Sequence, residues 1–180
     1  MIQQSASKKC FVCGIENPVG LHMEFFESDT DPIQVWAQYT VPEKYQSYPG
    51  IVHGGIVATM LDEVTSRTIF RGDPPRIVVT ARLSIKYRKP VPVETPLWLS
   101  GQIVDDKGKI VTVKGQIADK EGMVLAEAEA VLVEVSPGFF GENVVSGEDW
   151  QVYPKDSESG RDIELTTQQK TPSDEAKNDH

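Results

Sequence analysis

Apolar and polar positions alternate along much of the chain in a way that predicts β-strands. Residues 21–26 and 33–41 are rich in β-branched and aromatic side chains. A polar, turn-forming segment separates them, so we expect a hairpin. Asp and Gly residues between the last three predicted strands are typical of tight hairpin turns. The further predicted strands are residues 76–88, 97–104, 110–118 and 123–135.

Residues 53–71 carry a different pattern, with apolar side chains three or four positions apart from Val57 to Thr68. This spacing predicts a helix, and apolar neighbours beside the stripe indicate that the helix is buried over a wide arc. The sequence Gly-Asp-Pro-Pro at 72–75 cannot continue it. One long helix next to an antiparallel sheet of about six strands predicts an α+β fold in which the sheet curls around the helix.

Length and charge divide the chain into unequal parts. Its 180 residues suffice for one domain. The net charge is −9, and the last 45 residues hold 10 acidic against 4 basic residues. We therefore expect an N-terminal segment at 1–20, a domain at 21–136, an extension at 137–154 that could dock on the domain, and an acidic, disordered tail at 155–180.

Composition also excludes several classes of protein. The negative net charge argues against binding to nucleic acid. No run of about 20 apolar residues could cross a membrane. Residues 1–9 lack the apolar stretch of a secretory signal, so we expect a cytoplasmic protein.

Cys10 and Cys13 form a Cys-x-x-Cys-Gly motif near the start of the chain. The motif resembles half of a zinc site, but a structural zinc site needs four ligands and His22 is the only further candidate nearby. A redox-active dithiol would need a preceding strand and a helix start, which the pattern does not provide. Local packing is the favoured interpretation, and no metal is expected.

The start of the predicted helix is a candidate binding site. Gly54 and Gly55 follow His53, and the unpaired N–H groups of a helix start attract anions. The alternative is structural, with glycines that allow close packing and a His53 that satisfies a backbone group. An oxyanion loop of the α/β-hydrolase type is excluded because no Gly-x-Ser-x-Gly motif is present.

Asp62 is a candidate functional carboxylate because it lies among apolar residues of the helix, where an unused charge is costly. A solvated acidic face is the alternative, and it fits the neighbouring Glu63 better. An α-helix advances about 1.5 Å and turns about 100° per residue, so Asp62 lies about 13 Å from His53 on the opposite side. A site that uses both residues therefore needs two chains.

Seven basic residues and one acidic residue lie between Arg67 and Lys89. Alternation along the predicted strand puts Arg82, Lys86 and Arg88 on the face away from the helix. These cations could bind phosphates, or they could form the solvated side of a half-buried sheet.

Together these motifs resemble the hotdog-fold acyl-CoA thioesterases of the PaaI-like branch, over residues 10–135. The resemblance rests on His-Gly-Gly-x6-Asp at 53–62, on Val-Thr-Ala-Arg-Leu-Ser-Ile-Lys-Tyr-Arg-Lys-Pro at 79–90, and on Cys-x-x-Cys-Gly-x-x-Asn-Pro-x-Gly-Leu at 10–21. It implies a hotdog fold and the hydrolysis of acyl-CoA thioesters. It also implies a homodimer or a dimer of dimers.

The resemblance further implies roles for individual residues. The Gly54 N–H would polarise the thioester carbonyl, with His53 beside it, and Asp62 of the neighbouring subunit would act as base or nucleophile. Thr80 matches the hydroxyl that holds the attacking water, although strict alternation puts it on the Arg82 face, so the strand must contain an irregularity. Ser-Tyr-Pro at 47–49 stands where some relatives carry a substrate-orienting Asn.

No cofactor is implied, because coenzyme A enters as part of the substrate. Gly55 and the cations are its candidate contacts, the latter for the phosphates. Two alternatives remain: an acyl-CoA-binding protein without activity, and a hydratase or dehydratase, whose usual His-Pro-Gly pattern is absent. The candidate phosphate-binding cations are Arg71, Arg82, Arg88 and Lys89.

Overall fold

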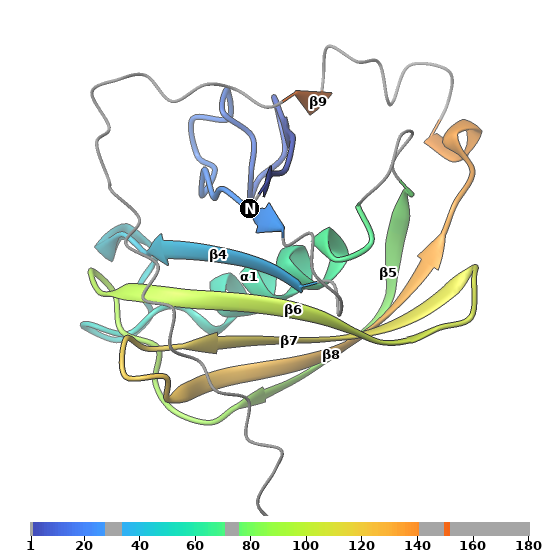
Figure 1. The fold of residues 1–180 in the computed structure, drawn as a ribbon. Coiled ribbons are helices and arrows are strands. Elements are labelled where there is room, and N and C mark those ends of the chain that lie inside the picture. Colours follow the sequence, from blue (N-terminus) through green and yellow to red (C-terminus); the bar gives the residue numbers. More distant parts are fainter. Residues whose placement is uncertain (1, 28–33, 71–75, 141–149, 152–180) are drawn as a thin grey trace, which may run out of the picture.

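The computed structural model describes residues 2–27, 34–70, 76–140 and 150–151. The described residues form one α-helix, two 3-10 turns and two antiparallel sheets (Figure 1). In chain order the elements are β1 (Ile2–Gln3), β2 (Ala6–Ser7), β3 (Phe26–Glu27), β4 (Gln34–Thr40), η1 (Glu43–Tyr45), α1 (Gly54–Arg67), β5 (Val78–Tyr87), β6 (Pro96–Asp106), β7 (Ile110–Ala118), β8 (Val124–Glu134), η2 (Pro137–Phe140) and β9 (Trp150–Gln151).

The main sheet has seven strands in the order β1-β3-β4-β6-β7-β8-β5, and α1 lies across one face of it (Figure 1). Three hairpin-connected strands, β6, β7 and β8, form its centre. At the turns, Asp106 Oδ1 accepts from the Gly108 N–H at 2.9 Å and Asp119 Oδ1 accepts from the Glu121 N–H at 3.1 Å. The predicted α+β class, with one helix against a large antiparallel sheet, is confirmed.

Helix α1 is buried on more than one side, as its wide apolar arc predicts. Met60, Leu61 and Val64 are fully buried, and α1 contacts strands β4 to β8. The N-terminal segment packs against the same helix, because Arg67 Nη1 donates to the Ser5 carbonyl at 2.6 Å. Residues 12, 13, 21, 23 and 25 belong to the same buried cluster as the helix. The helix is therefore held between the sheet and the N-terminal segment.

The strand predicted at residues 21–26 is wrong, because β3 begins only at Phe26. Leu21 and Met23 are buried and bond to the carbonyls of Phe11 and Val12 at 2.8 Å. Their alternation arises because one side of an extended segment covers the core without joining the sheet. The turn expected at 28–32 lies outside the described residues.

The helix ends at Arg67, four residues earlier than predicted. Thr68 Oγ1 donates to the Thr65 carbonyl at 2.7 Å, and the Thr68 and Ile69 N–H groups bond three residues back. These bonds tighten the last turn, although Ile69 continues the apolar pattern and is 2% exposed. Burial thus extends past the helix itself.

After β8, the chain returns toward its N-terminal end. Strand β9 pairs antiparallel with β2, which joins Trp150 to Ser7 and Gln151 to Ala6. Phe139 in η2 is 64% exposed. The predicted disordered tail at 155–180 lies outside the described residues. No described helix is both long and apolar enough to cross a membrane.

Candidate active site

Asp62 and Thr80 meet at the edge of the sheet. Thr80 Oγ1 donates a hydrogen bond to Asp62 Oδ1 at 2.7 Å. Strand β5 contains the irregularity that this contact requires: Thr80 pairs with Leu132 and Arg82 with Val131, so Ala81 is an extra residue. A bulge of this kind re-aims the side chains next to it. It turns the Thr80 hydroxyl toward the helix while Arg82 stays on the outer face.

The Asp62–Thr80 pair is open to solvent on one side. Asp62 is partly buried on α1, and Thr80 is exposed on β5, whose only neighbour in the described sheet is β8. The Thr80 hydroxyl uses its proton on Asp62, so its oxygen can still accept a hydrogen bond. Asp62 Oδ2 has no hydrogen-bond partner among the described residues. The pair can therefore hold a water between a carboxylate base and a hydroxyl acceptor.

At the start of α1, His53 is the N-cap of the helix. Its Nδ1 accepts a hydrogen bond from the Gly55 N–H at 3.0 Å, which is the structural role considered for this residue. The Gly55 N–H is thereby occupied. The Gly54 N–H forms no hydrogen bond within the described part of the chain. Gly54 is thus the backbone donor that this helix start leaves for a ligand.

Tyr87 fixes the same helix start, a contact that the sequence pattern did not reveal. Its hydroxyl donates to the Gly54 carbonyl at 2.9 Å, although the side chain is 54% exposed. A Cβ on Gly54 would lie 3.7 Å from the Tyr87 ring, which is an ordinary contact. Tyr87 is the last residue of β5, so the strand that carries Thr80 also holds the helix start.

Gly54 and Asp62 do not lie close enough to act on one atom within a single chain. They are eight residues apart on a continuous helix, which separates them by about 12 Å along its axis. A substrate carbonyl that contacts Gly54 therefore lies beyond reach of the Asp62 of the same chain.

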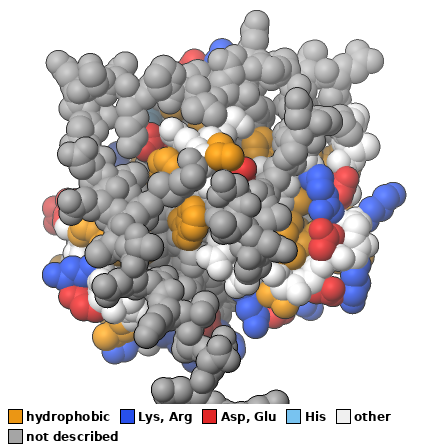
Figure 2. All heavy atoms as spheres, viewed as in Figure 1, with side chains coloured by type: hydrophobic (Ala, Val, Ile, Leu, Met, Phe, Trp, Pro, Cys, Tyr) orange, Lys and Arg blue, Asp and Glu red, His pale blue; other side chains and the backbone are white. Residues whose placement is uncertain are grey.

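In the structure, carboxylates neutralise part of the positive charge of residues 67–89. Arg67 is 3% exposed and pairs with Glu63 at 2.9 Å, so it adds no positive charge to the surface. Arg76 pairs with Asp106 and Glu134, both at 2.8 Å. On the face shown in Figure 2, Lys and Arg side chains are interspersed with Asp and Glu.

Carboxylates on β8 also neutralise basic side chains on the outer face of β5. Arg88 pairs with Glu127 at 2.6 Å, and Arg82 lies 3.9 Å from Glu129. The hydrogen bond from Arg88 lowers the pKa of Glu127 below its ordinary value. Lys89 forms no ion pair within the described ranges, and Arg71 lies outside them.

The two cysteines lie beside α1 rather than in an isolated motif. The sulfur atoms of Cys10 and Cys13 and a carboxylate oxygen of Glu63 are all within 4.8 Å of one another. The expectation of a solvated Glu63 is wrong, because its side chain is 18% exposed and is held by Arg67. His22, the further candidate ligand considered from the sequence, bonds to the Asn17 carbonyl at 2.6 Å.

The two thiols share a hydrogen bond with opposite effects on their acidity. This bond lowers the pKa of Cys10 to about 6, against the opposing effects of burial and Glu63. It raises the pKa of Cys13, and burial raises it further.

Comparison with known proteins identifies this architecture as a hotdog fold. Protein RHA08564, a thioesterase superfamily protein, superposes with a TM-score of 0.63 and 30% identity over 70% of this chain and 63% of its own. Residues 49–126 match the family model described as "Thioesterase superfamily". Residues 49–126 are therefore similar to the thioesterase superfamily.

Curated relatives match over part of their length. Acyl-coenzyme A thioesterase THEM4 of Mus musculus is 32% identical over 94 residues, which is 51% of this chain and 39% of the relative. The Rattus norvegicus protein of the same name is 26% identical over 107 residues, which is 59% of this chain and 45% of the relative. The chain thus matches less than half the length of either relative.

A structural neighbour contains a coenzyme A derivative. A Streptococcus mutans UA159 protein bound to acetyl CoA superposes with a TM-score of 0.55 over 62% of this chain and 89% of its own, with 21% identity. At this identity the likeness concerns the fold.

Proposed function

We propose that this protein hydrolyses acyl-CoA thioesters to a free acid and CoA. The hydrogen bond between Thr80 and Asp62 is the observation that carries the proposal. Thr80 and Asp62 together provide a water site with a base, and Gly54 provides an N–H at the positive end of a helix dipole. The names of the curated relatives support the same substrate class.

The reaction follows from these groups. Asp62 accepts a proton from a water held by Thr80, and the water oxygen bonds to the thioester carbonyl carbon. The resulting oxyanion receives a hydrogen bond from Gly54, which stabilises charge that is absent in the ground state. When the carbonyl re-forms, the C–S bond breaks and the sulfur leaves as a thiolate, whose conjugate thiol has a pKa of about 8.5. This leaving group needs no metal and little acid catalysis.

The proposed site is built from two chains, because Gly54 and Asp62 of one chain are about 12 Å apart. Strand β5 offers the surface for pairing: it is ten residues long, lies at the end of the sheet and carries Thr80. Unpaired N–H and C=O groups of such an edge readily pair with another strand. A homodimer through this edge would put the Asp62–Thr80 pair of one chain opposite the helix start of its partner.

The CoA phosphates are proposed to contact the cations after β5. Lys89 is the best candidate, because Arg82 and Arg88 already face carboxylates. Acetyl CoA in a structural neighbour supports a nucleotide-bearing substrate.

The proposal is tested by incubating the purified protein with acyl-CoAs of different chain length and measuring free thiol. Gly54→Pro removes the proposed N–H donor at the first helical position, where proline is well tolerated. His53, the preceding residue, has φ −58° and ψ 134°, the extended conformation that a residue before proline favours. Gly54→Ala keeps the N–H and is the matched control.

We expect thiol release by the natural protein and by Gly54→Ala, and a loss of about 100-fold for Gly54→Pro. Tight acyl-CoA binding without thiol release would mean a binding protein and would refute hydrolysis. Equal activities of the two Gly54 variants would refute the proposed oxyanion donor.

Phosphate binding is tested separately with Lys89→Ala, with Lys107→Ala on the turn at the opposite end of the sheet as control. Lys89→Ala should raise KM for acyl-CoA several-fold without changing kcat, because the contact is the same in the ground state and the transition state. An N-acetylcysteamine thioester lacks the nucleotide and should be hydrolysed unchanged. A loss that is equal for both substrates would make Lys89 structural.

A further inference from the structure

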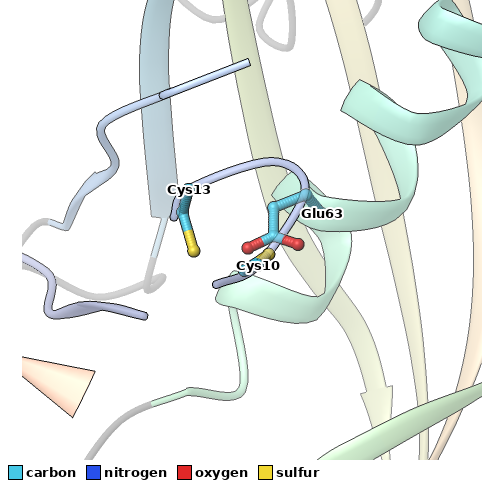
Figure 3. Close-up of side chains that lie close together, drawn as sticks. All are labelled: Cys10, Cys13 and Glu63. Atoms are coloured by element: carbon cyan, nitrogen blue, oxygen red, sulfur yellow. The ribbon is translucent and has the colours of Figure 1, made fainter. Parts of the chain in front are cut away.

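Three metal-binding side chains converge at a place that thioester hydrolysis does not use. Cys10 and Cys13 lie on the N-terminal loop and Glu63 lies on α1, with their sulfur and oxygen atoms directed toward a common point (Figure 3). All three donor atoms lie within 4.8 Å of one another. In tetrahedral zinc sites with bonds of about 2.3 Å to sulfur, the donors are about 3.8 Å apart. A contraction of about 1 Å or less would complete such a site.

The loop is built so that both sulfur atoms face the same side. The Gly14 N–H donates to the Cys10 carbonyl at 2.9 Å, which closes a tight turn around the motif. A Cβ at position 14 would lie 2.3 Å from that carbonyl oxygen, so only glycine fits there. The Val12 N–H donates to Cys10 Sγ at 3.3 Å. The backbone therefore orients one sulfur as an acceptor and positions the other beside it.

Charge is balanced in the metal-bound site. The thiols lose their protons when they bind a metal, so the two thiolates and the Glu63 carboxylate then carry three negative charges. Arg67, 3% exposed, contributes one positive charge through its contact with Glu63 Oε1 at 2.9 Å, which leaves Oε2 for a second partner. A divalent cation makes the group neutral.

We propose that Cys10, Cys13 and Glu63 bind one Zn²⁺, with water as the fourth ligand. Sulfur donors together with one carboxylate favour zinc over magnesium or calcium, which prefer oxygen ligands alone. Binding releases the thiol protons to solvent and leaves the metal divalent, so no oxidant or reductant is needed.

The metal would join two parts of the fold. The cysteines precede Glu63 by about 50 residues in the chain, and Glu63 is adjacent to Asp62 on α1. Zn²⁺ would therefore stabilise the packing of the N-terminal segment on α1. It acts on stability and not on the thioester, so the site is separable from the proposed activity.

The site is tested by titrating reduced full-length protein with Zn²⁺ and with Co²⁺ in the absence of substrate. We expect one equivalent to bind, a sulfur-to-cobalt charge-transfer band, protection of both thiols from alkylation, and a higher Tm with metal. Cys10→Ser, Cys13→Ser and Glu63→Gln should each weaken binding by at least about tenfold. Glu121→Gln, on an exposed turn, is the control carboxylate and should bind as the natural protein does.

The natural protein alone decides the question if a variant fails to fold. Absence of stoichiometric Zn²⁺ binding by the reduced natural protein would overturn the proposal. So would unchanged affinity in either cysteine variant, or in Glu63→Gln. A Cys10–Cys13 disulfide that forms equally fast with and without Zn²⁺ would likewise overturn it and indicate a redox pair.

Discussion

Removal of the Thr80 hydroxyl tests how the carboxylate is used. Thr80→Val keeps the shape of the side chain and removes the hydrogen bond of 2.7 Å to Asp62 Oδ1. A hydrogen bond to a charged group contributes about 1.5–3 kcal/mol, and the exposure of Thr80 favours the lower end. Since about 1.4 kcal/mol corresponds to a factor of ten, we expect kcat to fall about tenfold. Thr80→Ser retains the hydroxyl and should stay within about threefold of the natural protein.

A double-mutant cycle separates positioning from an independent contribution. Asp62→Asn should lower kcat by at least about 100-fold, because it removes the base. Thr80 acts through that carboxylate, so the double variant should be no more than about twofold slower than Asp62→Asn alone. Thiol release from acyl-CoA gives kcat, and circular dichroism checks the fold. Full activity of Thr80→Val, or losses that multiply in the double variant, would refute this reasoning.

Three further predictions concern the structure around the site. Tyr87→Phe removes the hydroxyl that bonds to the helix start. Urea unfolding should show a free energy of unfolding lower by about 1 kcal/mol, and kcat should fall several-fold. An unchanged kcat would show that Tyr87 does not contribute to the site. Gly101→Ala puts a Cβ 2.5 Å from the Val64 carbonyl oxygen, so urea unfolding should show a loss of about 1–3 kcal/mol, and full stability would contradict this close packing. The hydrogen bond from Arg76 lowers the pKa of Asp106, so this carboxylate stabilises the fold above its unfolded pKa of about 3.9 and loses that effect as the pH falls through its lower folded pKa. Asp106→Asn should therefore cost stability at pH 7 and progressively less below pH 4, and a cost that is independent of pH would contradict the ion pair.

The central elements of the fold could be predicted because their patterns report local geometry. Helix α1 and strands β5 to β8 follow from apolar spacing and from Asp-Gly turns, and β7 has the predicted bounds of 110–118. The prediction of a strand at residues 21–26 is wrong for a physical reason. Alternation shows that one side of an extended segment is buried, but it does not reveal whether the backbone N–H and C=O groups pair with a neighbouring strand.

The residues of the candidate site also differ in how far the sequence predicts them. Asp62 could be found because a carboxylate among apolar helix positions is costly. The orientation of Thr80 depends on the extra residue Ala81, and no turn residue in the strand marks that bulge. Glu63 was misassigned because its partners include residues about 50 positions away, although the spacing to Arg67, four positions on, was visible in the sequence.

Subunit complementation tests most directly whether thioester hydrolysis occurs at a site shared by two chains. Asp62→Asn lacks the base and Gly54→Pro lacks the oxyanion donor, so each should be nearly inactive alone. After mixing in equal amounts under conditions that allow the subunits to exchange, half of the dimers are mixed and one of their two sites is intact, which predicts about a quarter of the natural activity. A mixture no more active than its components, although mixed dimers have formed, would contradict a shared site.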